Sequence, residues 1–389
     1  MAFKGLDYYG IDDELTEEER LVRDNVRRFI DNEIEPIIGD HYQAGTFPEE
    51  LIPKFADLGL LGANLEGYGC AGMGEIAYGL AMQELERGDS GVRSFCSVQG
   101  ALCMYPIYAF GSDAQKERWL PPMAAGEVIG CFGLTEPDFG SNPTGMLTKA
   151  ESLPNGGYRL NGTKRWITNG CLAQVAIIWA KLDGGKVHGF LVPTETEGFS
   201  TRTIHDKFSL RASVTSELFM EDCQVGPDAL LPNVKGMKGP LSCLSQARFG
   251  IAFGAMGAAM SCYDCALEYA KDRVQFSRPI AGYQLVQQKL VHMVSEITKG
   301  QLLALRLGRL KESGKIRPPQ ISLAKRNNVS VALEIARIAR DVLGANGIMY
   351  EYPIGRHMMN LETVYTYEGT HDIHTLIVGQ DITGLAAFE

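Results

Sequence analysis

Residues 175–193, VAIIWAKLDGGKVHGFLVP, decide how the fold is interpreted. Two runs rich in β-branched and aromatic side chains flank an Asp-Gly-Gly turn, a pattern that is typical of a β-hairpin. The runs YRLNG and RWITN precede it. Together they predict a small antiparallel β domain at residues 130–235. The sequence lacks the alternating strands and helices of a doubly wound sheet and a Gly-x-Gly-x-x-Gly element after a strand, which disfavours a nicotinamide cofactor in a Rossmann fold.

Helical patterns lie on both sides of this β segment. Thr16 and Glu19 have capping-box spacing. We expect one buried face in the helix that follows, formed by Leu21, Val22, Val26, Phe29 and Ile30. A later helix is predicted from Leu285, Leu290, Met293, Val294 and Ile297, and another over residues 329–343 before Gly344. The predicted fold class is α+β, with an N-terminal α-helical domain at 1–129, the middle β domain at 130–235 and a C-terminal four-helix bundle at 236–389.

Composition narrows the range of functions. The 389 residues carry 37 Lys+Arg and 47 Asp+Glu, and the formal charge of −10 at pH 7 opposes a main role on nucleic acid or anionic membranes. The longest apolar run, residues 249–262, is shorter than the roughly 18 residues that a membrane span needs. We therefore predict no membrane span. The amino terminus is rich in acids and lacks the apolar core of a signal peptide, so we expect a cytoplasmic protein.

Metal binding is not predicted. The nine cysteines lack zinc-site spacing, since the one close pair, Cys262 and Cys265, has no second pair, and we expect reduced, mostly buried thiols. His371, Asp372 and His374 could hold zinc only with further ligands. We expect the two histidines to pack around the turn after residue 368 or to face a subunit contact.

Four motifs carry a family resemblance: GLTEPDFGSN opens the β segment, RWITNG lies within it, DRVQF follows a long helix, and YEGT lies near the carboxy terminus. Their order and spacing, over nearly the whole chain, resemble the acyl-CoA dehydrogenase family. Within it the likeness is nearest to the glutaryl-CoA dehydrogenases, through LERGDSGVRSFCSVQ, KFSLRAS and TYEGTHDIH. The resemblance implies an FAD enzyme that acts on an acyl-CoA ester and assembles as a homotetramer.

Glu368, in TYEGTHDIH, is the candidate catalytic residue. From the residues alone it is either a structural acid or a base held against a ligand, with Gly369 breaking the helical pattern after it. The resemblance implies that Glu368 abstracts the α-proton of the acyl thioester while the β-hydrogen leaves as hydride to the flavin N5. Burial would raise its pKa toward neutrality, which suits a general base. The Glu368 N–H and a ribityl hydroxyl of the flavin would support the thioester carbonyl.

The resemblance also assigns cofactor contacts. Without the resemblance, we would interpret GLTEPDFGSN as an ordinary loop, and Arg248 and Arg273 as residues on a solvated helix face. With it, Arg273, Gln275 and Phe276 would reach the FAD of a neighbouring subunit. The full set of FAD contacts that it implies is Phe132, Leu134, Thr135, Ser141, Trp166, Thr168, Arg273, Gln275, Phe276, Gly344, Asn346, Gly347, Thr370 and Asp372.

Arg93 lies in a mostly apolar helical stretch, where a cation is costly to bury without a partner. It either forms a salt bridge with Glu86 or binds the distal carboxylate of a substrate, and both can hold at once. The resemblance implies the second role, with Glu86 nearby, and Tyr367 resembles the tyrosine of decarboxylating members. The substrate contacts it implies are Arg93, Glu86, Ser97, Tyr367, Arg248 and Ser141.

The predicted function is the FAD-dependent oxidative decarboxylation of glutaryl-CoA to crotonyl-CoA and CO2, with electrons passing to an electron-transferring flavoprotein. Three alternatives stay open. The enzyme could stop before decarboxylation or take another dicarboxylic acyl-CoA. It could pass electrons to O2 as an oxidase. The chain could also be a non-catalytic flavin-binding relative, because a fold does not fix a function.

Overall fold

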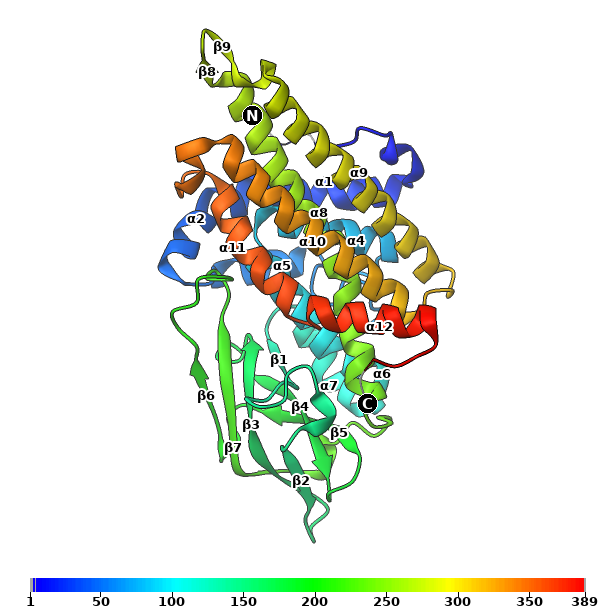
Figure 1. Ribbon diagram of the computed structural model, residues 1–389. Coiled ribbons are helices and arrows are strands. Elements are labelled where there is room, and N and C mark those ends of the chain that lie inside the picture. The colour runs from blue at the N-terminus through cyan, green and yellow to red at the C-terminus, as the bar shows by residue number, and fades with distance from the viewer. Residues whose placement is uncertain (1–2, 4, 388–389) are drawn as a thin grey trace.

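Helices from both ends of the chain form one side of the molecule, and a β domain forms the other (Figure 1). The computed structural model describes residues 3 and 5–387. The α+β class predicted from the sequence is confirmed. The amino-terminal helices are α1 (Glu17–Phe29), α2 (Glu35–Ala44), α3 (Ile52–Asp57), α4 (Glu75–Gly88), α5 (Ser90–Ser97), α6 (Tyr105–Phe110) and α7 (Asp113–Ala124).

The predicted capping box starts α1: Thr16 Oγ1 accepts from the Glu19 N–H at 3.2 Å, and Glu19 Oε2 accepts from the Thr16 N–H at 2.8 Å. The predicted buried face is wrong at Leu21, which is 58% exposed. Leu285, in α9 (Gln284–Glu312), is wrong in the same way, at 74% exposed. Each lies five residues before a buried residue, Val26 or Leu290, and five steps at 3.6 residues per turn place it about 140° around the helix.

The β domain is one seven-stranded sheet in the order β1-β4-β2-β3-β7-β6, with β5 paired to β4. The predicted hairpin is confirmed, since β4 and β5 pair antiparallel from Val175 opposite Pro193. The sheet is mixed rather than wholly antiparallel, because β4 runs parallel to both β1 and β2. The strands are β1 (Gly130–Gly133), β2 (Lys149–Ser152), β3 (Tyr158–Thr168), β4 (Val175–Leu182), β5 (Val187–Pro193), β6 (Phe199–Thr203) and β7 (Thr215–Val225).

The carboxy-terminal region is built around α8, whose 35 residues span about 50 Å. By length and composition α8 is apolar enough to cross a membrane, but 78% of its most apolar window is buried inside the molecule. We interpret it as a core helix. The helices of this region are α8 (Lys238–Asp272), α9 (Gln284–Glu312), α10 (Pro318–Val342), α11 (Pro353–Thr366) and α12 (His371–Thr383). A short hairpin of β8 (Val274–Gln275) and β9 (Arg278–Pro279) lies between α8 and α9 in the chain.

Glycines let α8 pack closely against α4, which carries Glu86. A Cβ on Gly257 would lie 1.8 Å from the Gln83 carbonyl oxygen, and one on Gly254 would lie 2.1 Å from Glu86 Oε2. A side chain at 257 would force the two helix backbones apart, and one at 254 would displace the Glu86 side chain. This close packing places the Glu86 carboxylate in the interior, beside the segment that follows α11.

Candidate active site

Glu368 lies in a short turn between α11 and α12, on the side of the helical region that faces the β domain (Figure 1). Its φ of 54° is in the left-handed region, which few non-glycine residues adopt. Gly369 follows with φ 96°, and a Cβ there would lie 2.8 Å from His374 Nε2. Thr370 then caps α12, its side chain accepting from the Ile373 N–H at 3.1 Å. The turn predicted at Gly369 is therefore confirmed.

The Glu368 carboxylate lies in an environment that favours its taking up a proton. Its Oε2 is buried and has no hydrogen-bond partner within the part of the chain that the structure describes. Burial raises the pKa of Glu368 above its ordinary value, although the cations Arg93, Arg248 and Lys325 act to lower it. A raised pKa and an unpartnered oxygen suit a general base.

Two side-chain cations donate hydrogen bonds to the backbone carbonyls of this turn. Arg248 Nε donates to the Glu368 carbonyl at 2.6 Å. Lys325 Nζ donates to the carbonyls of Tyr367 at 3.0 Å and Gly369 at 2.9 Å. The sequence analysis missed Lys325, because it lies within an ordinary helical pattern and its partners are backbone atoms 42 and 44 residues away. No residue pattern signals such a contact.

Arg93 and Glu86 form the buried ion pair that the sequence left open, with Arg93 Nε 2.8 Å from Glu86 Oε2. Ser90 Oγ donates to the other carboxylate oxygen of Glu86 at 2.9 Å. Arg93 Nη2 donates to Tyr367 Oη, next to the base. Arg93 Nη1, however, is buried and has no hydrogen-bond partner among residues 3 and 5–387. Burial alone would lower the pKa of Arg93, but Glu86 and Tyr367 raise it overall, so the side chain stays charged.

The remaining candidate substrate contacts differ in exposure. Ser97, at the end of α5, is buried with 1% of its surface exposed. Ser141 lies on the exposed loop before β2. Among the described residues no hydrogen bond links Ser141 to the Glu368 turn, so its predicted role in binding stays a prediction.

The edge of the β domain offers a surface that fits a flavin. Trp166 is 55% exposed with φ 63°, at an irregularity in the pairing of β3 with β7. The hydroxyls of Thr135 and Thr168 make no hydrogen bond within the described residues. The Arg165 guanidinium lies over the Trp166 ring, 5.0 Å from its centroid, and the indole is still more than half exposed. An exposed aromatic ring and free hydroxyls on the neighbouring segments can accept a planar, polar ring system. Phe132 and Leu134 are buried behind this edge, where they support it rather than form its surface.

A buried pair fixes the loop that starts in GLTEPDFGSN. Lys164 Nζ donates to Glu136 Oε1 at 2.9 Å and to the Leu134 carbonyl at 3.1 Å. Glu136 also accepts from the backbone N–H groups of Leu147 and Thr148. The sequence analysis did not identify this pair. It holds the loop against β3 and so positions Thr135.

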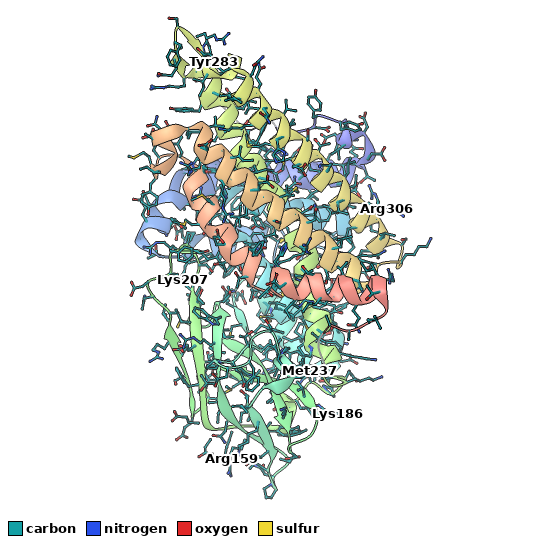
Figure 2. All side chains as sticks on the ribbon, viewed as in Figure 1. Arg159, Lys186, Lys207, Met237, Tyr283 and Arg306 are labelled. Carbon is teal, nitrogen blue, oxygen red and sulfur yellow. The ribbon has the colours of Figure 1, made fainter. Side chains whose placement is uncertain are left out.

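The residues of DRVQF lie far from this edge within one chain. Arg273 follows Arg248 by 25 residues at the end of α8, which corresponds to about 37 Å along a helix. Phe276 is 91% exposed on the hairpin formed by β8 and β9. Figure 2 shows Tyr283, beside this hairpin, at the opposite end of the molecule from Arg159 and Lys186 in the β domain. Arg273, Gln275 and Phe276 therefore cannot share a site with Trp166 in the same subunit.

The segment containing Gly344, Asn346 and Gly347 lies at that same far end. Asn346 Nδ2 donates to the hydroxyl of Tyr269 at 3.0 Å, and Tyr269 lies four residues before Arg273 in the chain. A Cβ on Gly347 would lie 2.1 Å from the Arg340 carbonyl oxygen. The internal packing of the chain thus already requires glycine at 347. Gly344, with φ 59° and open space around it, keeps its backbone accessible.

The two histidines pack around the Glu368 turn. His374 is fully buried beside Gly369, and burial, together with Lys325 and Arg248, lowers its pKa to about 3. His371 stacks on Tyr365 with ring centroids 4.4 Å apart. Asp372 is exposed in the first turn of α12. Among the described residues no group of three His, Cys, Asp or Glu side chains could hold a metal ion.

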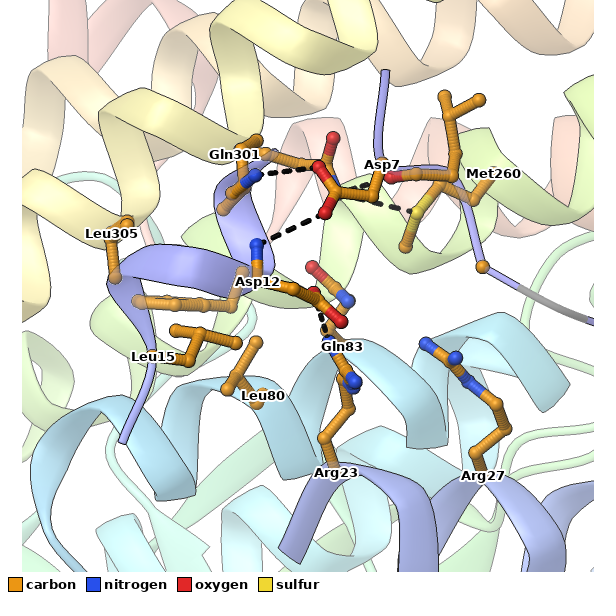
Figure 3. Close-up of a pocket in the computed structure, with 14 residues that line it drawn as sticks. Asp7, Asp12, Leu15, Arg23, Arg27, Leu80, Gln83, Met260, Gln301 and Leu305 are labelled. Carbon is orange, nitrogen blue, oxygen red and sulfur yellow. Dashed lines mark hydrogen bonds and ion pairs between the residues drawn. The ribbon is translucent and has the colours of Figure 1, made fainter. Parts of the chain in front are cut away.

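A cavity of about 50 Å³ lies elsewhere, under the amino-terminal segment (Figure 3). Asp7, Arg23, Gln83 and Gln301 are among its lining residues. None of the candidate catalytic, substrate or cofactor residues lines it. Its size suits one or two water molecules. Because none of these site residues lines it, the cavity is separate from the site around Glu368.

The fold and this site define the class of protein. The chain matches the acyl-CoA dehydrogenase N-terminal domain at residues 16–127, the middle domain at 131–223 and the C-terminal domain at 234–383. The mitochondrial short-chain specific acyl-CoA dehydrogenase of Homo sapiens is 34% identical over 94% of this chain and 90% of its own. The chain belongs to the acyl-CoA dehydrogenase family, whose cofactor is FAD.

Two solved structures are more similar still. The glutaryl-CoA dehydrogenase of Mycobacterium smegmatis has 56% sequence identity and a TM-score of 0.96, covering 98% of each chain. A second structure of a glutaryl-CoA dehydrogenase from M. smegmatis, in complex with FADH2, has 51% identity and a TM-score of 0.97 over 99% of each chain. The family resemblance stated from the motifs is thus confirmed.

Proposed function

We propose that this enzyme oxidises and decarboxylates glutaryl-CoA to crotonyl-CoA and CO2. The observation that carries the proposal is the unused Nη1 donor of Arg93, buried in the interior beside Tyr367 and the Glu368 turn. A buried guanidinium with an unmet donor is costly, and a substrate carboxylate would satisfy it. The similarity to two glutaryl-CoA dehydrogenases supports the same substrate.

In this proposal Glu368 removes the α-proton of the acyl thioester. Its buried, unpartnered Oε2 and raised pKa suit that step. Negative charge then develops on the thioester oxygen, where the Glu368 N–H would stabilise it. Trp166, Thr135 and Thr168 would hold FAD at the β-domain edge, where the flavin would supply the acceptor for the β-hydrogen as hydride.

Arg93 would hold the distal carboxylate during this step. Tyr367 shares the Nη2 group of Arg93, so the substrate carboxylate would not receive both ends of the guanidinium undisturbed. A weaker hold on that charge favours loss of CO2. Glu368, now protonated, would then return its proton to the distal carbon and so give crotonyl-CoA.

Partners follow from the same proposal. Arg273, Gln275 and Phe276 cannot reach the β-domain edge of their own subunit, so they would complete the FAD site of another copy in a homotetramer. An electron-transferring flavoprotein would reoxidise the enzyme.

The first experiment is anaerobic incubation of the purified flavoprotein with glutaryl-CoA and an artificial electron acceptor, followed by mass analysis of the CoA esters. Crotonyl-CoA is the expected product. Glutaconyl-CoA would keep the roles of Glu368 and Arg93 but refute decarboxylation. Reaction with butyryl-CoA and none with glutaryl-CoA would refute the substrate.

The second experiment tests the base. Glu368→Gln keeps the size of the side chain and removes its ability to accept the α-proton. We expect this variant to bind FAD normally and to lose bleaching of the flavin by glutaryl-CoA by at least about 1,000-fold. Bleaching at the wild-type rate would refute the role of Glu368.

A further inference from the structure

Three consecutive backbone carbonyls at the base turn accept hydrogen bonds from side-chain cations. Lys325 Nζ binds the carbonyls of Tyr367 and Gly369, and Arg248 Nε binds that of Glu368 between them. Because each peptide group is planar, fixing its carbonyl also fixes the direction of its N–H. The turn is therefore held in the left-handed conformation that Glu368 would otherwise rarely adopt.

Lys325 is an unusual residue to find in this place. It is 1% exposed, and no carboxylate within the described part of the chain forms an ion pair with it. Lys164, equally buried at 0% exposed, has Glu136 at 2.9 Å. Burial lowers the pKa of Lys325 to about 7, with Glu368 opposing this shift. An apolar side chain would fill the same space without the cost of burying an amine, so the contacts of Lys325 need a reason.

The reason lies in the peptide group between Tyr367 and Glu368. The Tyr367 carbonyl that accepts from Lys325 and the Glu368 N–H are opposite ends of that one group. A donor on the carbonyl draws electron density from the nitrogen and so makes the N–H a stronger donor. The Glu368 N–H itself donates to no backbone or side-chain acceptor in residues 3 and 5–387, which leaves it free for a ligand.

We propose that Lys325 is a positioning residue that aims and strengthens the Glu368 N–H as the donor to the thioester carbonyl of the bound acyl-CoA. The proposal rests on the proposed function, in which charge develops on that oxygen as the α-proton leaves. It concerns the thioester end that all acyl-CoA esters share. Both the ammonium and the neutral amine of Lys325 keep at least two N–H groups, so both carbonyl contacts survive its titration.

The test compares Lys325→Met with a matched control, Lys311→Met. Lys311 is also largely buried, but it donates to side chains, Glu75 at 2.7 Å and Gln246 at 2.6 Å. In the FAD-loaded enzyme we expect Lys325→Met to lower kcat about 10- to 100-fold with KM within about twofold, since removing a direct oxyanion donor costs 100- to 1,000-fold. The control should stay within about threefold of wild type in both.

A spectroscopic measurement separates this role from a structural one. Each substitution is placed in a Glu368→Gln background, so that the ester does not react. The carbonyl stretch of bound [1-¹³C]butyryl-CoA is then recorded by isotope-edited infrared spectroscopy. The downshift is the difference in carbonyl frequency between the free ester and the bound ester. We expect Lys325→Met to lose at least half of the downshift that the Glu368→Gln enzyme with Lys325 intact produces, and Lys311→Met to keep it.

An unchanged carbonyl shift in Lys325→Met would overturn the proposal, whatever happens to kcat. If that variant does not load FAD, Lys325→Gln takes its place, because Gln retains an NH2 group. Its carbonyl frequency should fall between that of the ester bound to the enzyme with Lys325 and that of the free ester in solution. A shift equal to wild type would again overturn the proposal. Failure of the proposed function is distinguishable, because it would appear as no turnover of glutaryl-CoA by the wild-type enzyme, whereas the butyryl-CoA shift reports on the thioester alone.

Discussion

Two buried arginine–carboxylate pairs lie on neighbouring helices and differ in one respect. Arg356 Nη1 contacts Asp89 Oδ2 at 2.8 Å, and Asp89 also accepts from Asn360 Nδ2 at 2.8 Å and the Gly91 N–H at 2.6 Å. Arg93 contacts Glu86 at the same 2.8 Å. Every buried donor of Arg356 has a partner within the described residues, whereas Arg93 Nη1 has none.

Under the proposed function, Arg93 binds a ligand and Arg356 is structural. Burial does not separate them, since Arg93 is 0% and Arg356 is 6% exposed. A carboxylate partner does not separate them either. The difference is a donor that the protein leaves unused, which a ligand can complete. Each pair can be broken separately, and the consequences should differ in kind.

The largest effect is expected from Arg356→Met. It leaves Asp89 buried without its cation, and removing one partner of a buried pair costs about 3–5 kcal/mol. Urea denaturation of the FAD-loaded enzyme measures this loss in the free energy of unfolding. The ratio of kcat/KM for glutaryl-CoA over butyryl-CoA should not change. A change in that ratio at full FAD occupancy would mean that the Arg356 pair also serves the substrate.

The Arg93 pair should show the opposite result when both members are replaced. Glu86→Gln with Arg93→Met removes the charge without leaving a lone ion, and such replacements are often neutral for stability. We expect the preference for glutaryl-CoA over butyryl-CoA to fall about 100-fold, because a charge-assisted hydrogen bond contributes about 1.5–3 kcal/mol. Steady-state kinetics with both esters measure this. A preserved preference would show that Arg93 does not bind the substrate carboxylate.

A third buried cation, Lys325, differs from both arginines, because no carboxylate among the described residues forms an ion pair with it. Its pKa is about 7 in the folded chain against an ordinary 10.5, so between these values the unfolded chain binds more protons and stability rises with pH. The cost of burying Lys325 is therefore greatest below pH 7. Relative to wild type, Lys325→Met should be more stable at pH 6 than at pH 8.5 by about 2 kcal/mol, from about 1.4 kcal/mol per pH unit. Equal differences at both pH values would contradict this.

The sequence predicted what depends on local pattern and on motifs. The hairpin at residues 175–193, the Thr16 capping box and the break at Gly369 follow from turn and cap chemistry that neighbouring residues determine. The Arg93–Glu86 pair could be proposed because the two residues are seven apart. Arg356–Asp89 spans 267 residues and Lys325–Tyr367 spans 42, so neither could be predicted. The parallel pairing of β4 was likewise missed, because it depends on how the whole sheet is assembled.

The smallest effect is expected at Ser90, which occupies the second oxygen of Glu86. While Ser90 holds that oxygen, Glu86 receives only Nε of Arg93, and Nη2 on the same side of the guanidinium stays on Tyr367. In Ser90→Ala the freed oxygen would compete with Tyr367 for Nη2, because a buried acceptor without a partner is costly, and the guanidinium with its unused Nη1 would shift. We expect kcat/KM for glutaryl-CoA to fall about 5- to 10-fold and that for butyryl-CoA to stay unchanged.

Ser322→Ala is the matched control, since Ser322 is also a buried helical serine, at 2% exposed, and contacts no carboxylate among the described residues. It should leave both esters unaffected. Equal losses on the two esters in Ser90→Ala would show that the serine supports the helix rather than the orientation of Glu86. The position of the Arg93 guanidinium would then not depend on Ser90.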